Sequence, residues 1–183
     1  MADYNARIAP FINTTFYVTS EYGIYRNGVL HVGLDIATPN GSSLYSMVNG
    51  KIIDKGFTEA RGYYVIMKDE TSGNAFLYQH MREDSPLNIN DNVKVGDYVG
   101  FEGDTGIVTG IHLHIEQQDL SSGRDWNFAQ DLQYYKNPCE FMGFPNTAGI
   151  SVIYNGTPIP PKQKIKKKFK WVLYLGNIRK RNK

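Results

Sequence analysis

The chain has 183 residues, enough for one domain with a sizeable core, and its 41% hydrophobic and 21% charged residues are typical of a globular protein. A single cysteine, Cys139, excludes an internal disulfide, and no stretch reaches the roughly 18–20 apolar residues of a membrane span. The net charge of +2 divides into −8 over residues 1–156 and +10 over residues 157–183, so nucleic-acid binding is not expected of the body.

Short apolar runs cut by Gly, Asn, Asp and Pro fill residues 18–115, which favours β-strands over helices. Two hairpins are predicted, one around Asn49-Gly50 within residues 43–57 and one joining residues 63–69 to 75–81. Strands bounded by glycine follow at 93–103, then an alternating strand at 111–118 and a short helix within 127–135. We therefore expect a mainly β protein, with an antiparallel β-sheet domain over residues 1–150.

Residues 151–183 are predicted to be a linker and a basic tail. The linker, "NGTPIPPKQK", is rich in proline and suggests an extended connection. The tail, "KQKIKKKFKWVLYLGNIRKRNK", has an apolar centre flanked by cations. Such a segment docks on an anionic wall polymer, a membrane surface or nucleic acid, or tethers the domain to a partner protein. The N-terminus lacks the basic and apolar segments of a secretory signal, so no signal peptide is expected.

The stretch "TGIHLHIE" holds two of the four histidines of the chain. In a strand, residues two apart project to the same side, about 6.6 Å apart. His112 and His114 are therefore predicted to face one space, a cleft wall, while Ile111, Leu113 and Ile115 face the core. Two exposed strand histidines without a function explain the same pattern equally well.

A second candidate site is "HVGLD", in which His31 and Asp35 are four residues apart. In a straight strand they would lie about 13 Å apart, so they converge only if the chain bends, and Gly33 permits a bend. His80 ends a β-type run in "FLYQHM". Histidine and aspartate suit Zn²⁺, and three protein ligands leave a catalytic zinc site open. Spacing alone does not say which three residues bind.

These motifs, together with "GYYVIM" and "VKVGDYVGFEGDTG", stand in the order found in lysostaphin-like (LytM-like) zinc metallopeptidases, which cut peptides of bacterial peptidoglycan. The resemblance covers residues 17–116. It implies one Zn²⁺ bound by His31, Asp35 and His114, in an open groove, with His112 and His80 as catalytic residues. Zinc lowers the pKa of a bound water toward neutrality, so a neighbouring histidine can act as its general base.

The resemblance thus implies a zinc endopeptidase that hydrolyses cross-links or stem peptides of peptidoglycan. Its basic tail and the expected absence of a signal peptide suggest a phage or prophage enzyme, associated with the virion or released at lysis, that acts at the cell wall. The tail would then bind wall polymer or a virion protein. The alternative is a non-catalytic wall-binding or phage-tail structural module that retains the fold. One minor expectation is that Cys139 is a buried apolar group. Tyr25 and Arg26 either line the cleft or have a structural role where the chain leads into the strand.

Overall fold

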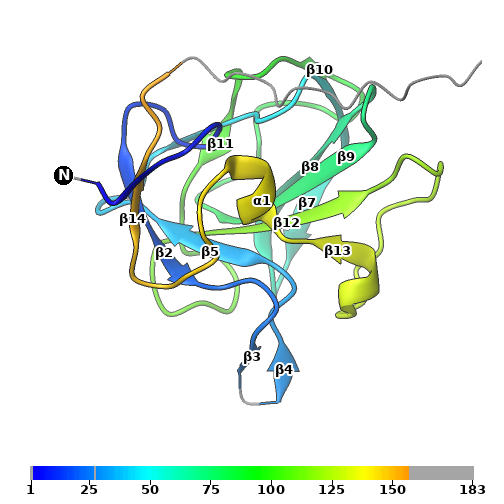
Figure 1. Ribbon diagram of the computed structural model, residues 1–183. Helices are drawn as coiled ribbons and strands as arrows, with labels where there is room; N and C mark the ends of the chain where they lie inside the picture. Colours follow the sequence, from blue (N-terminus) through cyan, green and yellow to red (C-terminus); the bar gives the residue numbers. More distant parts are fainter. Residues whose placement is uncertain (1, 27, 157–183) are drawn as a thin grey trace, which may run out of the picture.

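The computed structural model describes residues 2–26 and 28–156, and its regular structure is mostly β (Figure 1). The predicted tail from residue 157 onward lies outside the described residues. The strands are β1 (Tyr4–Asn5), β2 (Thr15–Ser20), β3 (Tyr25–Arg26), β4 (Val29–Leu30), β5 (Leu34–Ala37), β6 (Ser43–Tyr45), β7 (Gly50–Thr58), β8 (Gly62–Asp69), β9 (Asn74–Met81), β10 (Asn92–Val93), β11 (Tyr98–Phe101), β12 (Leu113–Asp119), β13 (Tyr135–Lys136) and β14 (Ser151–Ile153). The helices are the 3-10 helix η1 (Leu132–Tyr134) and α1 (Pro138–Met142).

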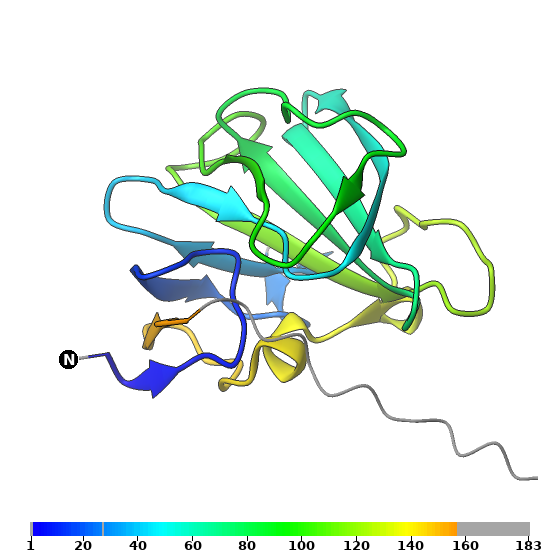
Figure 2. The ribbon, with the colours of Figure 1, turned by 90° about the horizontal axis from the view of Figure 1, so that it is seen from above.

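Within the described residues, ten strands form one sheet in the order β1-β14-β2-β5-β12-β9-β8-β7-β10, with β13 paired to β12. All of its pairs are antiparallel except β1 with β14. Seen from above, the sheet is strongly twisted, with β7–β9 turned away from β2 and β5 (Figure 2). The mainly β, antiparallel prediction is confirmed. The last strand, β14, lies just beyond the domain boundary expected at residue 150.

The main hydrophobic core covers one face of this sheet. Leu34 and Ile36 of β5 and Leu113 and Ile115 of β12 are fully buried in it, as is Leu44 of β6. The short helix α1 adds buried residues to the same core and contacts β12, beside which Figure 1 shows it. Because side chains alternate along a strand, the residues between these apolar positions emerge on the opposite face of the sheet.

The predicted hairpin at residues 63–81 is confirmed, since β8 and β9 pair from Tyr63↔Met81 to Lys68↔Ala75. The hairpin predicted around Asn49-Gly50 is wrong, because β6 pairs with β11 whereas β7 pairs with β8 and β10. Gly50 does not take the positive φ of a tight hairpin turn. It instead opens β7, where a Cβ would lie 1.8 Å from the carbonyl oxygen of Lys68.

The helix predicted within residues 127–135 is reduced to the single 3-10 turn η1. The described α-helix lies farther on, where Asn137 caps the N-terminus, Pro138 is the first helical residue and Gly143 ends the helix in the left-handed conformation. Its residue Cys139 is buried, as expected, and burial raises the pKa of the thiol to about 12. No helix of the described part of the chain is long and apolar enough to cross a membrane.

Candidate metal centre

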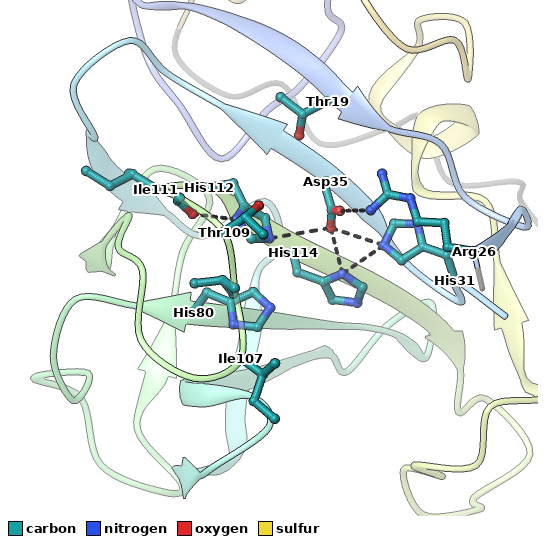
Figure 3. Close-up of a pocket in the computed structure, with 12 residues that line it drawn as sticks. Thr19, Arg26, His31, Asp35, His80, Ile107, Thr109, Ile111, His112 and His114 are labelled. Carbon is teal, nitrogen blue, oxygen red and sulfur yellow. Dashed lines mark hydrogen bonds and ion pairs between the residues drawn. The ribbon is translucent and has the colours of Figure 1, made fainter. Parts of the chain in front are cut away.

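Five polar side chains from three separate segments of the chain line one groove of about 430 Å³ on the face of the sheet opposite the core (Figure 3). Asp35 lies on β5, His80 on β9 and His114 on β12. His31 precedes β5, and His112 immediately precedes β12, where it forms an isolated bridge with Gly103. The structure therefore brings together all the residues that the sequence analysis selected.

Strand pairing sets the closest approach in this groove. His114 and Asp35 are register partners across β12 and β5, and His114 Nδ1 lies 2.8 Å from Asp35 Oδ1. The chain bends at Gly33, as predicted, so that His31 Nε2 lies 3.1 Å from Asp35 Oδ1 and 3.1 Å from His114 Nδ1. Ligands of a tetrahedral zinc ion at about 2.0–2.1 Å lie roughly 3.3 Å apart, so this spacing suits one metal ion.

The outward hydrogen bonds of the two imidazoles fix which nitrogen faces the groove. His31 Nδ1 donates to the carbonyl oxygen of Glu21 at 2.6 Å, which leaves the lone pair on Nε2. His114 Nε2 donates to Glu116 Oε1 at 3.2 Å, which leaves the lone pair on Nδ1. With Asp35 Oδ1, three acceptor atoms then face one another, an arrangement that requires a cation among them. Ligand atoms of these three residues lie within 4.8 Å of one another, so the set fits a metal ion.

Without a metal, a proton is the alternative cation. Burial alone would lower the pKa of His114, but its hydrogen bonds to Asp35 and Glu116 outweigh burial and raise this pKa to about 9. Burial would likewise raise the pKa of Asp35, and the hydrogen bonds from His114 and His31 lower it instead. A metal that binds here therefore displaces a proton from His114.

The other two histidines contact each other beside the candidate ligands. The ring centroids of His80 and His112 are 4.8 Å apart, and His112 Nε2 lies 3.8 Å from Asp35 Oδ1. His80 Nδ1 donates to the carbonyl oxygen of Thr105 and His112 Nδ1 to that of Gly110, each at 2.9 Å. In both rings Nε2 is left as a proton acceptor. Burial, reinforced by His114 and His112, lowers the pKa of His80 to about 4.

The backbone of His80 has a positive φ of 61°, although the residue lies in a strand. Such a conformation costs a non-glycine residue free energy and persists where surrounding contacts impose it. The pairing of β8 with β9 is irregular here, since its register shifts between Tyr63 and Val65. The backbone N of His80 donates to the Arg61 carbonyl, and its ring bonds Thr105. In this conformation the His80 ring lines the groove.

The prediction that Ile111 faces the core is wrong. Leu113 and Ile115 are fully buried, but Ile111 is 41% exposed and lines the groove. The regular strand begins only at Leu113, so the alternation does not extend back to Ile111. Arg26 lines the groove, whereas Tyr25 does not and is 73% exposed.

Sequence reasoning missed one group that supports the candidate ligands, Glu116, and a second role of Gly33. Glu116 holds the outer nitrogen of His114 and accepts a second hydrogen bond, of 2.7 Å, from Gln79 on β9. Its i+2 spacing from His114 was a usable signal. Gly33 serves close packing, because a Cβ there would lie 2.3 Å from His114 Nε2. Its φ is not positive, so only the packed structure reveals this requirement.

The sequence model of Peptidase family M23 matches residues 29–126, more than half of the chain. The chain belongs to this family. All five groove residues lie within the matched M23 segment. Among its relatives, the chain is 32% identical to the DD-carboxypeptidase/endopeptidase Mpg of Neisseria meningitidis over 60% of this chain and 25% of that protein. It is 31% identical to the glycyl-glycine endopeptidase ALE-1 of Staphylococcus capitis over 63% of this chain and 31% of that protein. The chain thus spans a third or less of each relative.

Solved structures share the M23 fold. The catalytic domain of the prophage-encoded M23 protein EnpA from Enterococcus faecalis, a mutant, matches 72% of this chain and 95% of its own, with a TM-score of 0.56 and 26% identity. The catalytic domain of lysostaphin from Staphylococcus simulans matches 70% of this chain and 91% of its own, with a TM-score of 0.55 and 23% identity. The lysostaphin-like resemblance of the sequence is therefore confirmed.

Proposed function

We propose that this M23 chain is a zinc-dependent endopeptidase that hydrolyses peptide cross-links or stem peptides of bacterial peptidoglycan. The observation that carries the proposal is the set of three acceptor atoms, from His31, Asp35 and His114, that face one another in an open groove beside two further imidazoles. The names of the relatives agree with it, since they are endopeptidases.

In this proposal His31 Nε2, Asp35 Oδ1 and His114 Nδ1 hold one Zn²⁺. When bound, the ion would polarise the scissile carbonyl and make a water molecule acidic enough to attack near neutral pH. His112 Nε2 accepts a proton from the attacking water and returns it to the leaving amine as the C–N bond breaks. His112 is assigned this role because its Nε2 lies 3.8 Å from Asp35, at the edge of the candidate metal site.

His80, whose ring contacts that of His112, is assigned the role of orienting the reactants. Its lowered pKa, about 4, keeps the ring neutral at pH 7, so Nε2 is a hydrogen-bond acceptor rather than a cation. It therefore orients the attacking water or a substrate N–H, and it is a poor source of positive charge for the oxyanion.

Chelation tests the proposal. Purified cell walls treated with the protein should release new amines, a chelator should abolish the release, and added zinc should restore it. Mass spectrometry of the fragments then identifies the bond. A protein that binds walls and zinc but releases no amine would support the alternative, a non-catalytic wall-binding or tail structural module.

We further propose that the enzyme is encoded by a phage or prophage and reaches the wall as part of a virion or at lysis. Similarity to the prophage-encoded EnpA domain supports this origin. Detection of the protein in purified virions, or its restriction to culture supernatants after induced lysis, would test it.

A further inference from the structure

Arg26 introduces a positive charge at the edge of the candidate metal site. It lies on β3, whose hairpin with β4 protrudes at the foot of Figure 1, and its guanidinium points toward Asp35 in Figure 3. Of the lysines and arginines in the described part of the chain, it alone lines the groove. Because residues 1–156 carry a net charge of −8, this cation is not part of a generally basic surface.

The contact with Asp35 uses little of what this guanidinium offers. Arg26 Nη1 lies 3.6 Å from Asp35 Oδ2, beyond hydrogen-bond distance, and the arginine side chain is 52% exposed. A guanidinium has five N–H donors in a rigid fork that matches a carboxylate. Asp35 directs its other oxygen, Oδ1, to His31 and His114. Arg26 is therefore placed to bind a further anion within the groove.

The loop between β11 and β12 lines the groove with apolar side chains. Ile107 is 80% exposed and Ile111 is 41% exposed, and both belong to the groove lining together with Val108. The base of this loop is held by Thr105, whose hydroxyl accepts a hydrogen bond from Tyr63 N and donates one to the Met81 carbonyl. Large apolar side chains held open to solvent in a groove fit a ligand that carries alkyl groups. Glycine residues carry no alkyl side chain, so a peptide of glycine alone would leave these apolar groups without a contact.

We propose that Arg26 binds a substrate carboxylate within about one residue of the scissile bond and that Ile107 and Ile111 contact an alkyl side chain of the same substrate. The substrate class is then an anionic stem peptide that contains alanine, and not a neutral glycine bridge. The relatives include enzymes named for both kinds of bond, so they do not decide between them. The carboxylate is either the chain terminus or a side-chain group. This inference rests on the proposed endopeptidase function.

Four short peptides test the proposal with the zinc-loaded full chain: one ending in D-Ala-D-Ala and one of glycine only, each as the free acid and as the C-terminal amide. The alanine peptide as the free acid should have the highest kcat/KM. Amidation should lower this value about 10- to 100-fold, the loss expected for one charge-assisted hydrogen bond. A fifth peptide carries a side-chain carboxylate beside the alanines and is compared with its side-chain amide. A loss only on amidation of that side chain would identify it as the group bound.

Arg26→Gln should abolish the higher kcat/KM of the free-acid peptide over its amide, mainly by raising KM for the acid. The kcat/KM for the amide should change little. Lys136→Gln is the matched control, because this substitution also removes one positive charge. Lys136 pairs with Asp119, and neither residue lines the groove. A binding measurement without turnover uses the zinc-loaded His112→Ala protein. By calorimetry it should bind the acid more tightly than the amide, and the added Arg26→Gln change should abolish the difference.

Two outcomes would overturn the proposal, and a third would refute the function on which it rests. Equal rates for every acid and amide, the side-chain amide included, or a best rate with the glycine amide, would show that Arg26 does not select an anion. Equal losses on acid and amide in Arg26→Gln, with weaker zinc binding, would show that the arginine acts through Asp35. Failure to cleave any peptide or purified wall, with zinc bound, would instead refute the proposed function itself.

Discussion

The two rings proposed as ligands present opposite nitrogens to the groove. His31 uses Nε2 because its Nδ1 donates to a backbone carbonyl, and His114 uses Nδ1 because its Nε2 donates to Glu116. His112 resembles His31 in its outward bond, yet its Nε2 lies 3.8 Å from Asp35 Oδ1, farther than either ligand nitrogen. In the proposed assignment, the position of the ring, and not its chemistry, therefore decides whether a histidine binds the metal or acts beside it.

The first prediction separates these roles. His114→Ala should lose both stoichiometric zinc and hydrolysis, because two ligand atoms do not hold the ion tightly. His112→Ala should retain zinc and lose activity by about 100-fold or more, the contribution of a general base. Elemental analysis measures the zinc content of both variants, and amine release from cell walls measures their hydrolysis. A fully active His112→Ala protein would refute the assignment of the base.

Gly33 lies against the ring of His114, and the second prediction concerns this contact. In Gly33→Ala the new Cβ would lie 2.3 Å from His114 Nε2 and 2.9 Å from the Ile115 carbonyl oxygen. We expect a loss of about 1–3 kcal/mol in the free energy of unfolding, with weaker zinc binding, since the ring must move. Denaturant unfolding and zinc titration measure both.

Gly110→Ala is the matched control for this change. Gly110 also lines the groove, but a Cβ added there would meet no atom within 4 Å, and its φ is not positive. The Gly110→Ala protein should keep the free energy of unfolding and the zinc affinity of the unchanged chain. If Gly33→Ala behaved like Gly110→Ala, the close approach to His114 would not matter for the site.

Glu116 gives the third prediction. Its carboxylate orients His114 and increases the electron density of the ring, so Glu116→Gln should weaken zinc binding about 10- to 100-fold. The affinity should be measured at pH 7 and above the His114 pKa of about 9, where a proton no longer competes with the metal. Glu102→Gln serves as the control, because Glu102 is an equally buried carboxylate that binds Thr38. Unchanged affinity in Glu116→Gln would contradict the argument.

The four histidines and Asp35 could be selected from the sequence because imidazole is scarce in it, but their spacing left the ligands open and the family resemblance assigned the roles. The contacts through which Glu116, Gly33 and Arg26 act on the site could not be predicted. The i+2 spacing of Glu116 from His114 indicates a shared face of the strand, but not the hydrogen bond between the two side chains. Gly33 and Arg26 matter through distances to other side chains in the folded chain, which a linear pattern does not contain.

At the scale of elements, prediction succeeded where a turn joins strands that pair with each other. β8 and β9 do so across residues 70–73, and Gly73 takes the positive φ that the turn requires. It failed at Asn49-Gly50, where the same kind of turn signal precedes a strand whose partners come from elsewhere. Local turn chemistry therefore predicts that the chain can turn, and tertiary pairing decides whether it does.

The fourth prediction concerns the loop between β11 and β12. Thr105→Val keeps the shape of the side chain but leaves Tyr63 N and the Met81 carbonyl without the bonds that the hydroxyl provides. We expect a loss of about 1–3 kcal/mol in unfolding free energy and faster amide exchange in residues 104–111. Because the Thr105 carbonyl also holds His80, kcat/KM should fall.

Thr58→Val is the comparison for this loop. The Thr58 hydroxyl accepts one hydrogen bond, from Arg61 N, within the turn that joins β7 and β8. Its loss should cost less stability and leave exchange in residues 104–111 unchanged. Equal effects of the two substitutions would show that Thr105 has no special hold on the loop.

At the scale of the whole molecule, the site depends on strand order. β5 and β12 lie side by side, and β9 lies on the other side of β12, so Asp35, His114 and Gln79 form one row across the sheet. The sequence predicted strands at β9 and β12 but neither β5 nor this order, because pairing between segments far apart in the chain is set by the packing of the whole core. The resemblance to a known family supplied the grouping that periodicity could not.

The last prediction concerns charge over the whole chain. Residues 1–156 carry −8 and would be repelled by an anionic cell wall, whereas residues 157–183 carry +10. Replacing Lys164, Lys166, Lys167, Lys168 and Lys170 by glutamine should weaken sedimentation of the full chain with anionic wall preparations. Salt should have less effect on the remaining binding, because fewer charges are left to screen. Hydrolysis of a small soluble peptide should not change, since the groove residues are untouched. Undiminished wall binding would show that another surface docks the enzyme, and a parallel loss of peptide hydrolysis would show that the basic segment serves the groove itself.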